Sequence, residues 1–376
     1  MPRARSGAPV ETIGSRLAAR GGFGPGFDWI RIVLAVSVAA THINSIVPRG
    51  AGHFALPPAY HFGILYAFFG LSGFLVTASA ERLGLGQFML NRSLRIFPAL
   101  MVDIALSAML LGAIFTTLPL AAYYAHPATH RYLLNMLGAV QLHLPGVFET
   151  STVSAVNYSL WTVPFELACY ALIGGLIVSR GFRHAPALAL LWVAAGFAVA
   201  AMSGRLGPLE PALRHLFVLK GSRLLVAFLL GIAACRWRDR IPRDARLLAA
   251  ALAACVALDL VLAPREDAVF YPALSLLLGV PVLYVTLWLG TADLPTPALL
   301  KRGDYSYGIY LYHWPIMQAL VLVLPDLRHA ALYFLAVMPV VAAFAAVSWH
   351  LVEKPVLRQR RHFSFAARQR AMRPGD

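Results

Sequence analysis

The sequence predicts an all-α membrane protein with about ten transmembrane helices. Hydrophobic residues make up 59% of the 376-residue chain and charged residues only 13%, a composition unlike that of a soluble domain. Apolar stretches long enough to cross the ~30 Å hydrocarbon core recur along the whole chain. We place the spans at residues 28–47, 61–80, 94–118, 158–178, 186–203, 217–235, 247–263, 269–290, 307–325 and 331–352.

The basic residues predict how the chain is oriented. If the N-terminus is cytoplasmic, about three quarters of the 32 Lys and Arg residues fall in cytoplasmic segments, the side that these residues prefer. Both termini are then cytoplasmic, with tails at residues 1–27 and 354–376 and a membrane domain at 28–353. This topology and anionic membrane lipids account for the net charge of +15, so we expect no nucleic-acid partner.

The first span, residues 28–47, carries Arg31 near one end and His42 eleven residues further along. At about 100° a residue, this spacing puts both side chains on one helix face, ~16 Å apart along the axis. Ionisable residues are costly inside a bilayer and usually face a cavity in which chemistry or transport occurs. The helix therefore predicts a site that reaches from the membrane surface into its interior.

The third span, 94–118, has Arg92 and Arg95 at its inner mouth, three residues apart and hence on one face. Arginine suits phosphate oxygens, and Arg31 belongs to the same inner layer, so a phosphate-rich cytosolic cofactor is the expected ligand. Ordinary anchoring by positive charges is the alternative for this pair. Asp103 is expected to be a structural hydrogen-bond partner.

Residues 119–157 form the longest stretch without a span, and the topology places them outside. Residues 132–144 within it are apolar but too short to cross the bilayer, so we predict an interfacial or re-entrant helix there. The next span, 158–178, contains Glu166, whose carboxylate would be expensive there unless paired. We expect it to orient His42 or to bind a sugar hydroxyl.

Aromatic residues surround two further polar positions. Trp161 suits either the interfacial belt or stacking on a sugar ring. His313 lies between aromatic residues and before Pro315, where a packed, hydrogen-bonded histidine is commoner than a reacting one. At the inner end of the last helix, His350 and Glu353 are spaced to pair in a structural role.

Six fragments of the chain, in order, resemble the acyltransferase-3 family of integral-membrane acyltransferases. The resemblance covers roughly residues 27–356. The fragments are DWIRIVLAVSVAATHI, FFGLSGFLV, RSLRIFPAL, SLWTVPFELACY, YSYGIYLYHWP and LVEKP. Thr-Val-Pro-Phe before Glu166 departs from the commoner form of its motif and resembles the branch acting on exopolysaccharides and lipo-oligosaccharides.

The resemblance implies a ten-helix protein of the bacterial inner membrane. Its members take an acyl group, usually acetyl, from cytosolic acyl-CoA and place it on a hydroxyl of an envelope or secreted glycan. The functional residues that carry over by motif are Arg31, His42, Arg92, Arg95, Trp161 and Glu166, and we add His313 and Tyr310 as candidates for substrate contact.

The residues alone suggest a mechanism that agrees with the resemblance. A hydroxyl is a poor nucleophile at neutral pH, so a neutral His42 that takes its proton would supply the usual gain of about 10²–10⁴. The three arginines would anchor the CoA phosphates. No residue spacing is typical of a metal site, so we expect acyl-CoA as donor substrate and no resident cofactor.

A proton-coupled transporter or glycan exporter is the competing class, because buried His, Glu and Arg also suit a carrier. The sequence shows no inverted repeat and no paired broken helices, and the motif order favours the acyltransferase. The sequence leaves open the acceptor, the acyl chain length, direct transfer against an acyl-enzyme, and the oligomeric state.

Overall fold

The computed structural model describes residues 10–22, 24–47, 52–54, 57–217, 220–262, 276–295, 297 and 302–359. In this part of the chain every regular element is a helix, and the only strand-like pairings are two isolated bridges. The all-α prediction is therefore confirmed for the described residues. Residues 360–376, most of the predicted C-terminal tail, lie outside them.

The chain forms two compact units, each made of three segments. Unit 1 comprises residues 1–30, 57–78 and 180–296, and unit 2 comprises 31–56, 79–179 and 297–376.

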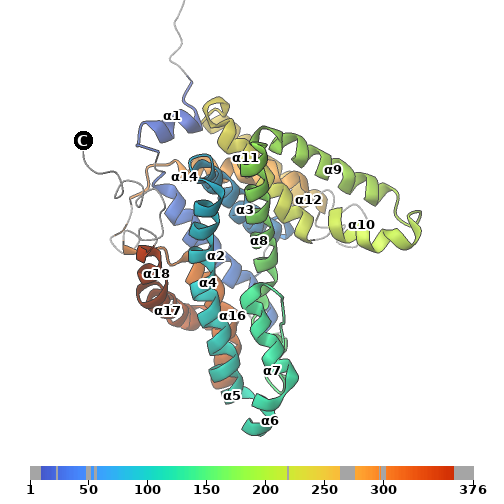
Figure 1. The fold of residues 1–376 in the computed structure, drawn as a ribbon, viewed down its shortest axis with the longest axis vertical. Helices are drawn as coiled ribbons and strands as arrows, with labels where there is room; N and C mark the ends of the chain where they lie inside the picture. Colours follow the sequence, from blue (N-terminus) through green and yellow to red (C-terminus); the bar gives the residue numbers. More distant parts are fainter. Residues whose placement is uncertain are drawn as a thin grey trace, which may run out of the picture. The chain divides into compact units, whose positions relative to one another are not determined.

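Unit 2 is built around α4 (Leu85–Ala105), which packs against α8 (Val163–Ser179) and α16 (Ser306–Val323), as Figure 1 shows. Its further elements are most of α2 (Gly26–Ile46), η1 (Leu106–Leu111), α5 (Gly112–Phe115), α6 (Leu120–Ala125), α7 (Pro127–Tyr132), η2 (Leu133–Leu137), η3 (Tyr158–Thr162), α17 (Ala330–Ser348), η9 (Trp349–Glu353) and α18 (Lys354–Gln359).

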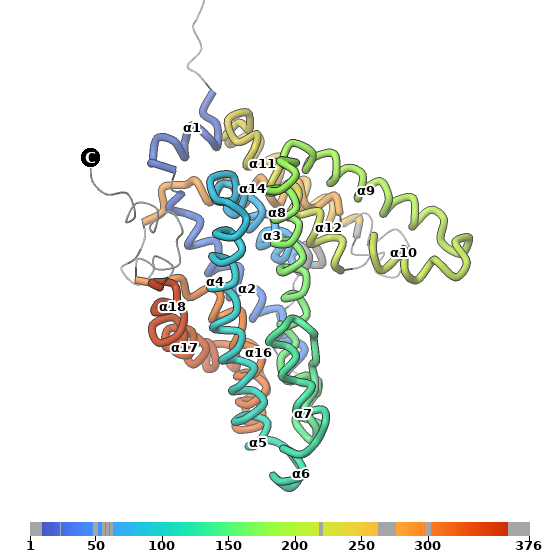
Figure 2. The backbone as a smooth tube through the Cα atoms, in the orientation of Figure 1, coloured from blue at the N-terminus to red at the C-terminus, as the bar shows by residue number. Residues whose placement is uncertain are grey.

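Unit 1 contains most of α3 (Pro58–Ala80) and a hairpin in which α9 (Ala185–Ala201) turns back into α10 (Glu210–Phe217), visible in Figure 2. Its further elements are α1 (Ile13–Ala18), η4 (Phe182–His184), η5 (Gly207–Leu209), α11 (Lys220–Arg236), η6 (Arg238–Arg240), α12 (Ala245–Leu262), η8 (Leu276–Leu278) and α14 (Gly279–Gly290).

Glycines let α3 and α11 approach closely inside unit 1. A methyl group placed on Gly73 would overlap the carbonyl of Phe228, and one placed on Gly231 would overlap the carbonyl of Gly70. Helices in a bilayer gain little from hydrophobic burial against each other, so close packing through small residues is a main source of their association.

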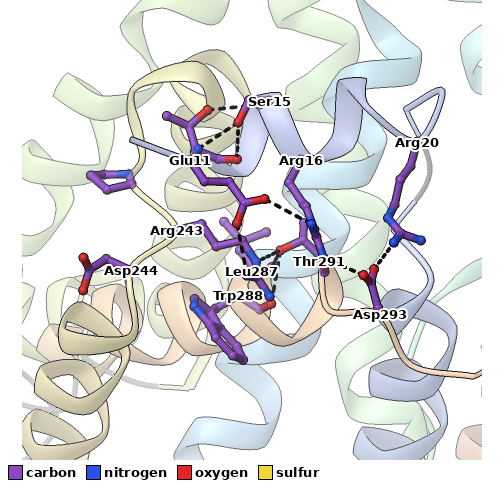
Figure 3. A network of polar contacts seen from close by, with 12 residues as sticks. Glu11, Ser15, Arg16, Arg20, Arg243, Asp244, Leu287, Trp288, Thr291 and Asp293 are labelled. Carbon is purple, nitrogen blue, oxygen red and sulfur yellow. Dashed lines mark hydrogen bonds and ion pairs between the residues drawn. The ribbon is translucent and has the colours of Figure 1, made fainter. Parts of the chain in front are cut away.

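Ion pairs hold the N-terminal helix α1 on unit 1 (Figure 3). Arg16 reaches Glu11 at 3.1 Å and Asp293 at 2.6 Å. Arg20 also pairs with Asp293, and Arg243 reaches Glu11 at 3.3 Å. Part of the predicted N-terminal tail is therefore a docked helix.

Helices that could cross a membrane recur along the described part of the chain. Six are long and apolar enough to span, and a seventh is obtained if the bent pair at 207–217 and 221–236 counts as one crossing. Each of the ten predicted spans overlaps a helix of the structure. The number ten and the cytoplasmic placement of both termini remain predictions.

Two predictions about helix bounds are wrong. The third helix begins at Leu85 instead of residue 94, so Arg92 and Arg95 lie about two and three turns inside it and not at its mouth. Residues 132–144 do not form one helix, because the short η2 ends at Gly138, which has φ +81°. Beyond it the Asn135 side chain bonds the backbone of Gln141 at both its NH and its carbonyl.

The long α4 rod contains a π-helical segment, η1, before it ends in α5. Wider π turns leave carbonyl groups in need of donors. The hydroxyls of Tyr123 and Tyr124 supply them, to the carbonyls of Ala108 at 2.6 Å and Met109 at 2.8 Å. The α6 helix is thereby tied to the end of the rod.

Candidate active site

Two histidines from α2 and α16 meet inside unit 2. His42 Nδ1 lies 2.8 Å from His313 Nε2, and the rings are stacked with centroids 5.1 Å apart. His313 is completely buried, whereas His42 is half-buried. Trp314 presents an edge-to-face contact to the His42 ring at 4.9 Å. The imidazole predicted as the base is thus held by a second imidazole and an indole.

A proline in α16 explains how this helix is fastened at the site. Pro315 has no N–H, so the carbonyl of Leu311, four residues earlier, loses its helical donor. The buried Asn157 side chain replaces it, donating to Leu311 at 3.0 Å and to Asp103 at 2.9 Å. Asp103 is therefore a structural hydrogen-bond partner, as predicted, and joins α4 to the segment before η3.

The two aromatic candidates are Tyr310 in α16 and Trp161 in η3. The Tyr310 hydroxyl is 2.6 Å from the Thr162 hydroxyl and donates to the Ser159 carbonyl at 3.2 Å. Its ring is 6.1 Å from that of His313. Trp161 stays partly exposed and contacts Phe165 edge-on at 5.9 Å. The structure therefore brings Tyr310 to the histidine pair.

A network of alternating charges joins α2 and α4 to the segment before α16 and to η9. Arg31 reaches Asp304 at 2.8 Å. Arg95 reaches the same carboxylate at 2.7 Å and Glu353 at 2.7 Å. Glu353, which is 1% exposed, also accepts a bond from Ser348. Two of the three predicted phosphate-binding arginines thus already share an acidic partner.

Asp304 is strongly favoured in its charged form. Burial raises the pKa of this carboxyl, but the guanidinium groups of Arg31 and Arg95 and the hydrogen bonds from Ser306 outweigh it and lower the pKa to about 2. The Ser306 hydroxyl donates to Asp304 at 2.6 Å. Asp304 therefore stays ionised across the physiological range and neutralises one of its arginines.

Arg92 differs from its neighbour Arg95. It lies against the Phe88 and Tyr170 rings, with its guanidinium carbon about 6 Å from each centroid. Its Nε is buried without a hydrogen-bond partner among the described residues, and none of their carboxylates forms an ion pair with it. Arg92 is therefore a cation with unused donor capacity.

Glu166 lies at the arginine layer. Its Oε1 accepts a hydrogen bond from Tyr170 at 2.7 Å, and its carboxylate is within electrostatic range of Arg31, Arg92 and Arg95. The sequence suggested that Glu166 orients His42, but the Nδ1 atom of His42 meets His313 instead.

Several residues that build the site were not predicted. Asp304 and Asn157 were missed, although an Asp just before an apolar helix beside an arginine-rich layer is a recognisable signal. The expected pairing of Glu353 with His350 is wrong: Glu353 binds Arg95, and His350 lies 3.2 Å from the Tyr305 hydroxyl. Within the described residues, no group of three or more His, Cys, Asp or Glu side chains is placed to hold a metal ion.

Comparison with known proteins decides the family. The acyltransferase-3 family model, described as an acyltransferase domain, matches residues 25–351. The chain belongs to this family. It is therefore an acyltransferase, and its apolar helices make it a multi-pass membrane protein.

Two relatives are similar over nearly their whole length. An O-acetyl transferase of Shigella phage Sf6 is 26% identical over 346 residues, 88% of this chain and 95% of the phage protein. Nodulation protein 10 of Rhizobium leguminosarum bv. viciae is 29% identical over 357 residues, 89% of this chain and 93% of that protein. No solved structure is significantly similar to the chain.

Proposed function

We propose that this acyltransferase moves an acetyl group from cytosolic acetyl-CoA to a hydroxyl of a cell-envelope or secreted glycan at the inner membrane. The observation that carries the proposal is that α2 bears both His42 and, about 16 Å away along its axis, Arg31 of the arginine layer. The relative named as an O-acetyl transferase supports the choice of acetyl and of an oxygen acceptor.

The arginine layer is proposed to bind the phosphates of the donor. Arg92 is the first contact, because its guanidinium has a buried Nε without a partner among the described residues, whose carboxylates form no ion pair with it. Arg31 keeps 32% of its side chain exposed and can add a second contact while Asp304 holds it in place. Arg95 is 17% exposed and shared by two carboxylates, so its larger role is to hold the layer together.

The chemistry is proposed to occur at His42. The imidazole takes the proton of the acceptor hydroxyl as its oxygen attacks the thioester carbonyl carbon. The tetrahedral intermediate then collapses, the carbon–sulfur bond breaks, and the CoA sulfur leaves with the proton from His42. Transfer therefore releases one free thiol for each ester formed.

The acceptor is proposed to be held by Trp161, Tyr310 and Glu166, of which Tyr310 lies beside the histidine pair. Trp161 is partly exposed and presents an indole on which a sugar ring can stack. The Tyr310 hydroxyl and the Glu166 carboxylate are polar groups suited to sugar hydroxyls. A glycan or glycolipid is therefore the partner that we infer beside acyl-CoA and membrane lipid.

The proposal is tested by free-thiol release from the purified protein, supplied with acetyl-CoA and a panel of envelope glycans. We expect acceptor-dependent release in the wild type and none in His42→Ala. Arg92→Gln should raise the KM for acetyl-CoA about tenfold with little change in kcat, because a charge-assisted hydrogen bond contributes about 1.5–3 kcal/mol.

Arg82→Gln is the matched control, since Arg82 is an exposed arginine in the turn before α4. It should leave the KM unchanged. Folded protein that releases no thiol with any glycan would refute the transferase and favour the proton-coupled transporter or glycan exporter. An equal effect of Arg82→Gln and Arg92→Gln would show that only general positive charge matters.

A further inference from the structure

The backbone of α16 determines which nitrogen of His313 carries a proton. His313 Nδ1 is 3.1 Å from the carbonyl oxygen of Ile309. A carbonyl oxygen only accepts hydrogen bonds, so Nδ1 is the protonated nitrogen. The ring has no exposed surface, and its bonds within the described residues go to no carboxylate. A neutral ring follows, with its lone pair on Nε2.

The tautomer of His313 in turn determines that of His42. His42 Nδ1 lies 2.8 Å from the lone pair on His313 Nε2. It must therefore donate, which places the single proton of neutral His42 on Nδ1 and its lone pair on Nε2. Ser159 Oγ is 3.4 Å from the same His313 nitrogen and is also able to donate to it.

We propose that His313 is a positioning residue: it holds His42 in the Nδ1-protonated tautomer, so that Nε2 of His42 accepts the proton of the acceptor hydroxyl. The inference rests on the proposed function and names the atom that performs it. During transfer, Nε2 of His42 gains the proton and later gives it to the leaving sulfur. Nδ1 remains bonded to His313, which keeps its own proton throughout.

The surroundings of His313 favour positioning over substrate contact. The side chain is completely buried, and two residues that follow it fasten its helix. The Trp314 indole donates to the Ala155 carbonyl at 2.9 Å, and the Gln318 amide donates to the same carbonyl at 2.9 Å. A ring held this firmly orients its neighbour at little entropic cost, as the orienting partners of catalytic or metal-bound histidines do.

Two substitutions separate orientation from mere packing. In His313→Gln, the side-chain oxygen can occupy the place of Nε2 and accept the bond from His42. In His313→Leu the volume is similar but no acceptor remains. We expect His313→Leu to lower kcat about 10–100-fold, with the KM for acetyl-CoA within about twofold of the wild type, and His313→Gln to recover most of the loss.

A folded His313→Leu protein with kcat within about threefold of the wild type would overturn the proposal. So would equal defects in the two variants, which would indicate a packing role. Thermal unfolding in detergent establishes that each protein is folded.

Nitrogen NMR on the wild type tests the same idea without a change at residue 313. The protein is labelled with ¹⁵N-histidine, and the His42 signals are assigned by their loss from His42→Asn among the twelve histidines. We expect a proton on Nδ1 and none on Nε2 when His42 is neutral. The opposite tautomer would overturn the inference even if transfer is observed. Absence of turnover in the wild type would refute the proposed function but leave the tautomer measurable.

Discussion

Replacing Arg95 with glutamine should destabilise the protein more than any other single change in the arginine layer. Arg95 connects Asp304 and Glu353, with both distances at 2.7 Å. After Arg95→Gln, Asp304 keeps its ion pair with Arg31. Among the described residues, Glu353 keeps only the bond from Ser348 at 3.2 Å, so a carboxylate that is 1% exposed loses its charged partner there.

The size of the effect follows from this burial. Removing one partner of a buried ion pair costs about 3–5 kcal/mol, because the remaining charge is left uncompensated. Arg95 itself keeps 17% of its side chain exposed, so water screens part of the interaction and we take the lower end, about 3 kcal/mol. For a unit of this size, that lowers the midpoint of unfolding by about 6–12 °C.

The assay is thermal unfolding of the purified variants in one detergent, with Glu353→Gln and the double variant as companions. In Arg95→Gln/Glu353→Gln the buried charge is gone, and two amides can bond each other. We expect the double variant to regain at least half of the loss, a coupling of about 1.5 kcal/mol or more. A loss below about 1 kcal/mol in Arg95→Gln, or losses that simply add, would refute the reasoning.

Two further predictions concern acid stability and helix packing. The pKa of Asp304 is lowered from 3.8 to about 2 in the folded protein. Its contribution to the free energy of unfolding is therefore complete above pH 3.8 and is lost as the pH falls toward 2. Because 24% of the Asp304 side chain is exposed, we expect this pH-dependent part of the free energy of unfolding to be about 1–2 kcal/mol and to be missing in Asp304→Asn. An acid denaturation curve that is the same in the variant and the wild type would contradict this. Gly73→Ala should destabilise unit 1 by about 1–3 kcal/mol because its methyl group meets the Phe228 backbone. Gly175→Ala, which adds a methyl where nothing lies within 4 Å, should be neutral or stabilising in the same unfolding assay, and equal losses would refute the packing argument.

The helices and several candidate site residues could be predicted from the sequence for a simple physical reason. A helix in a bilayer satisfies its own backbone, so apolar length alone predicts where helices lie, and each predicted span overlaps a helix. The cost of ionisable groups in apolar segments singled out Arg31, His42 and Glu166 in the same way. Asp103 was also recognised as a structural partner, which its bond to Asn157 confirms.

The ion-pair partners of these residues could not be predicted from the sequence. Asp304 and Glu353 are 209 and 258 residues from Arg95 along the chain, and no local pattern relates such positions. The expected His350–Glu353 pair illustrates the error: i,i+3 spacing allowed it, but a buried arginine competes better for a carboxylate. The start of α4 at Leu85 was missed because its first turns are amphipathic rather than apolar.

The sequence by itself determined that this protein is an all-helical membrane acyltransferase, and it singled out a histidine and arginines as candidate site residues. These conclusions depend on composition, period and motif order, which are properties of the chain. Only the tertiary structure decided that Arg95 binds two carboxylates while Arg92 pairs with none of the described ones, and that His42 meets His313. Hydrogen bonds and ion pairs depend on distances of a few ångströms between helices remote in sequence, and packing alone sets those distances.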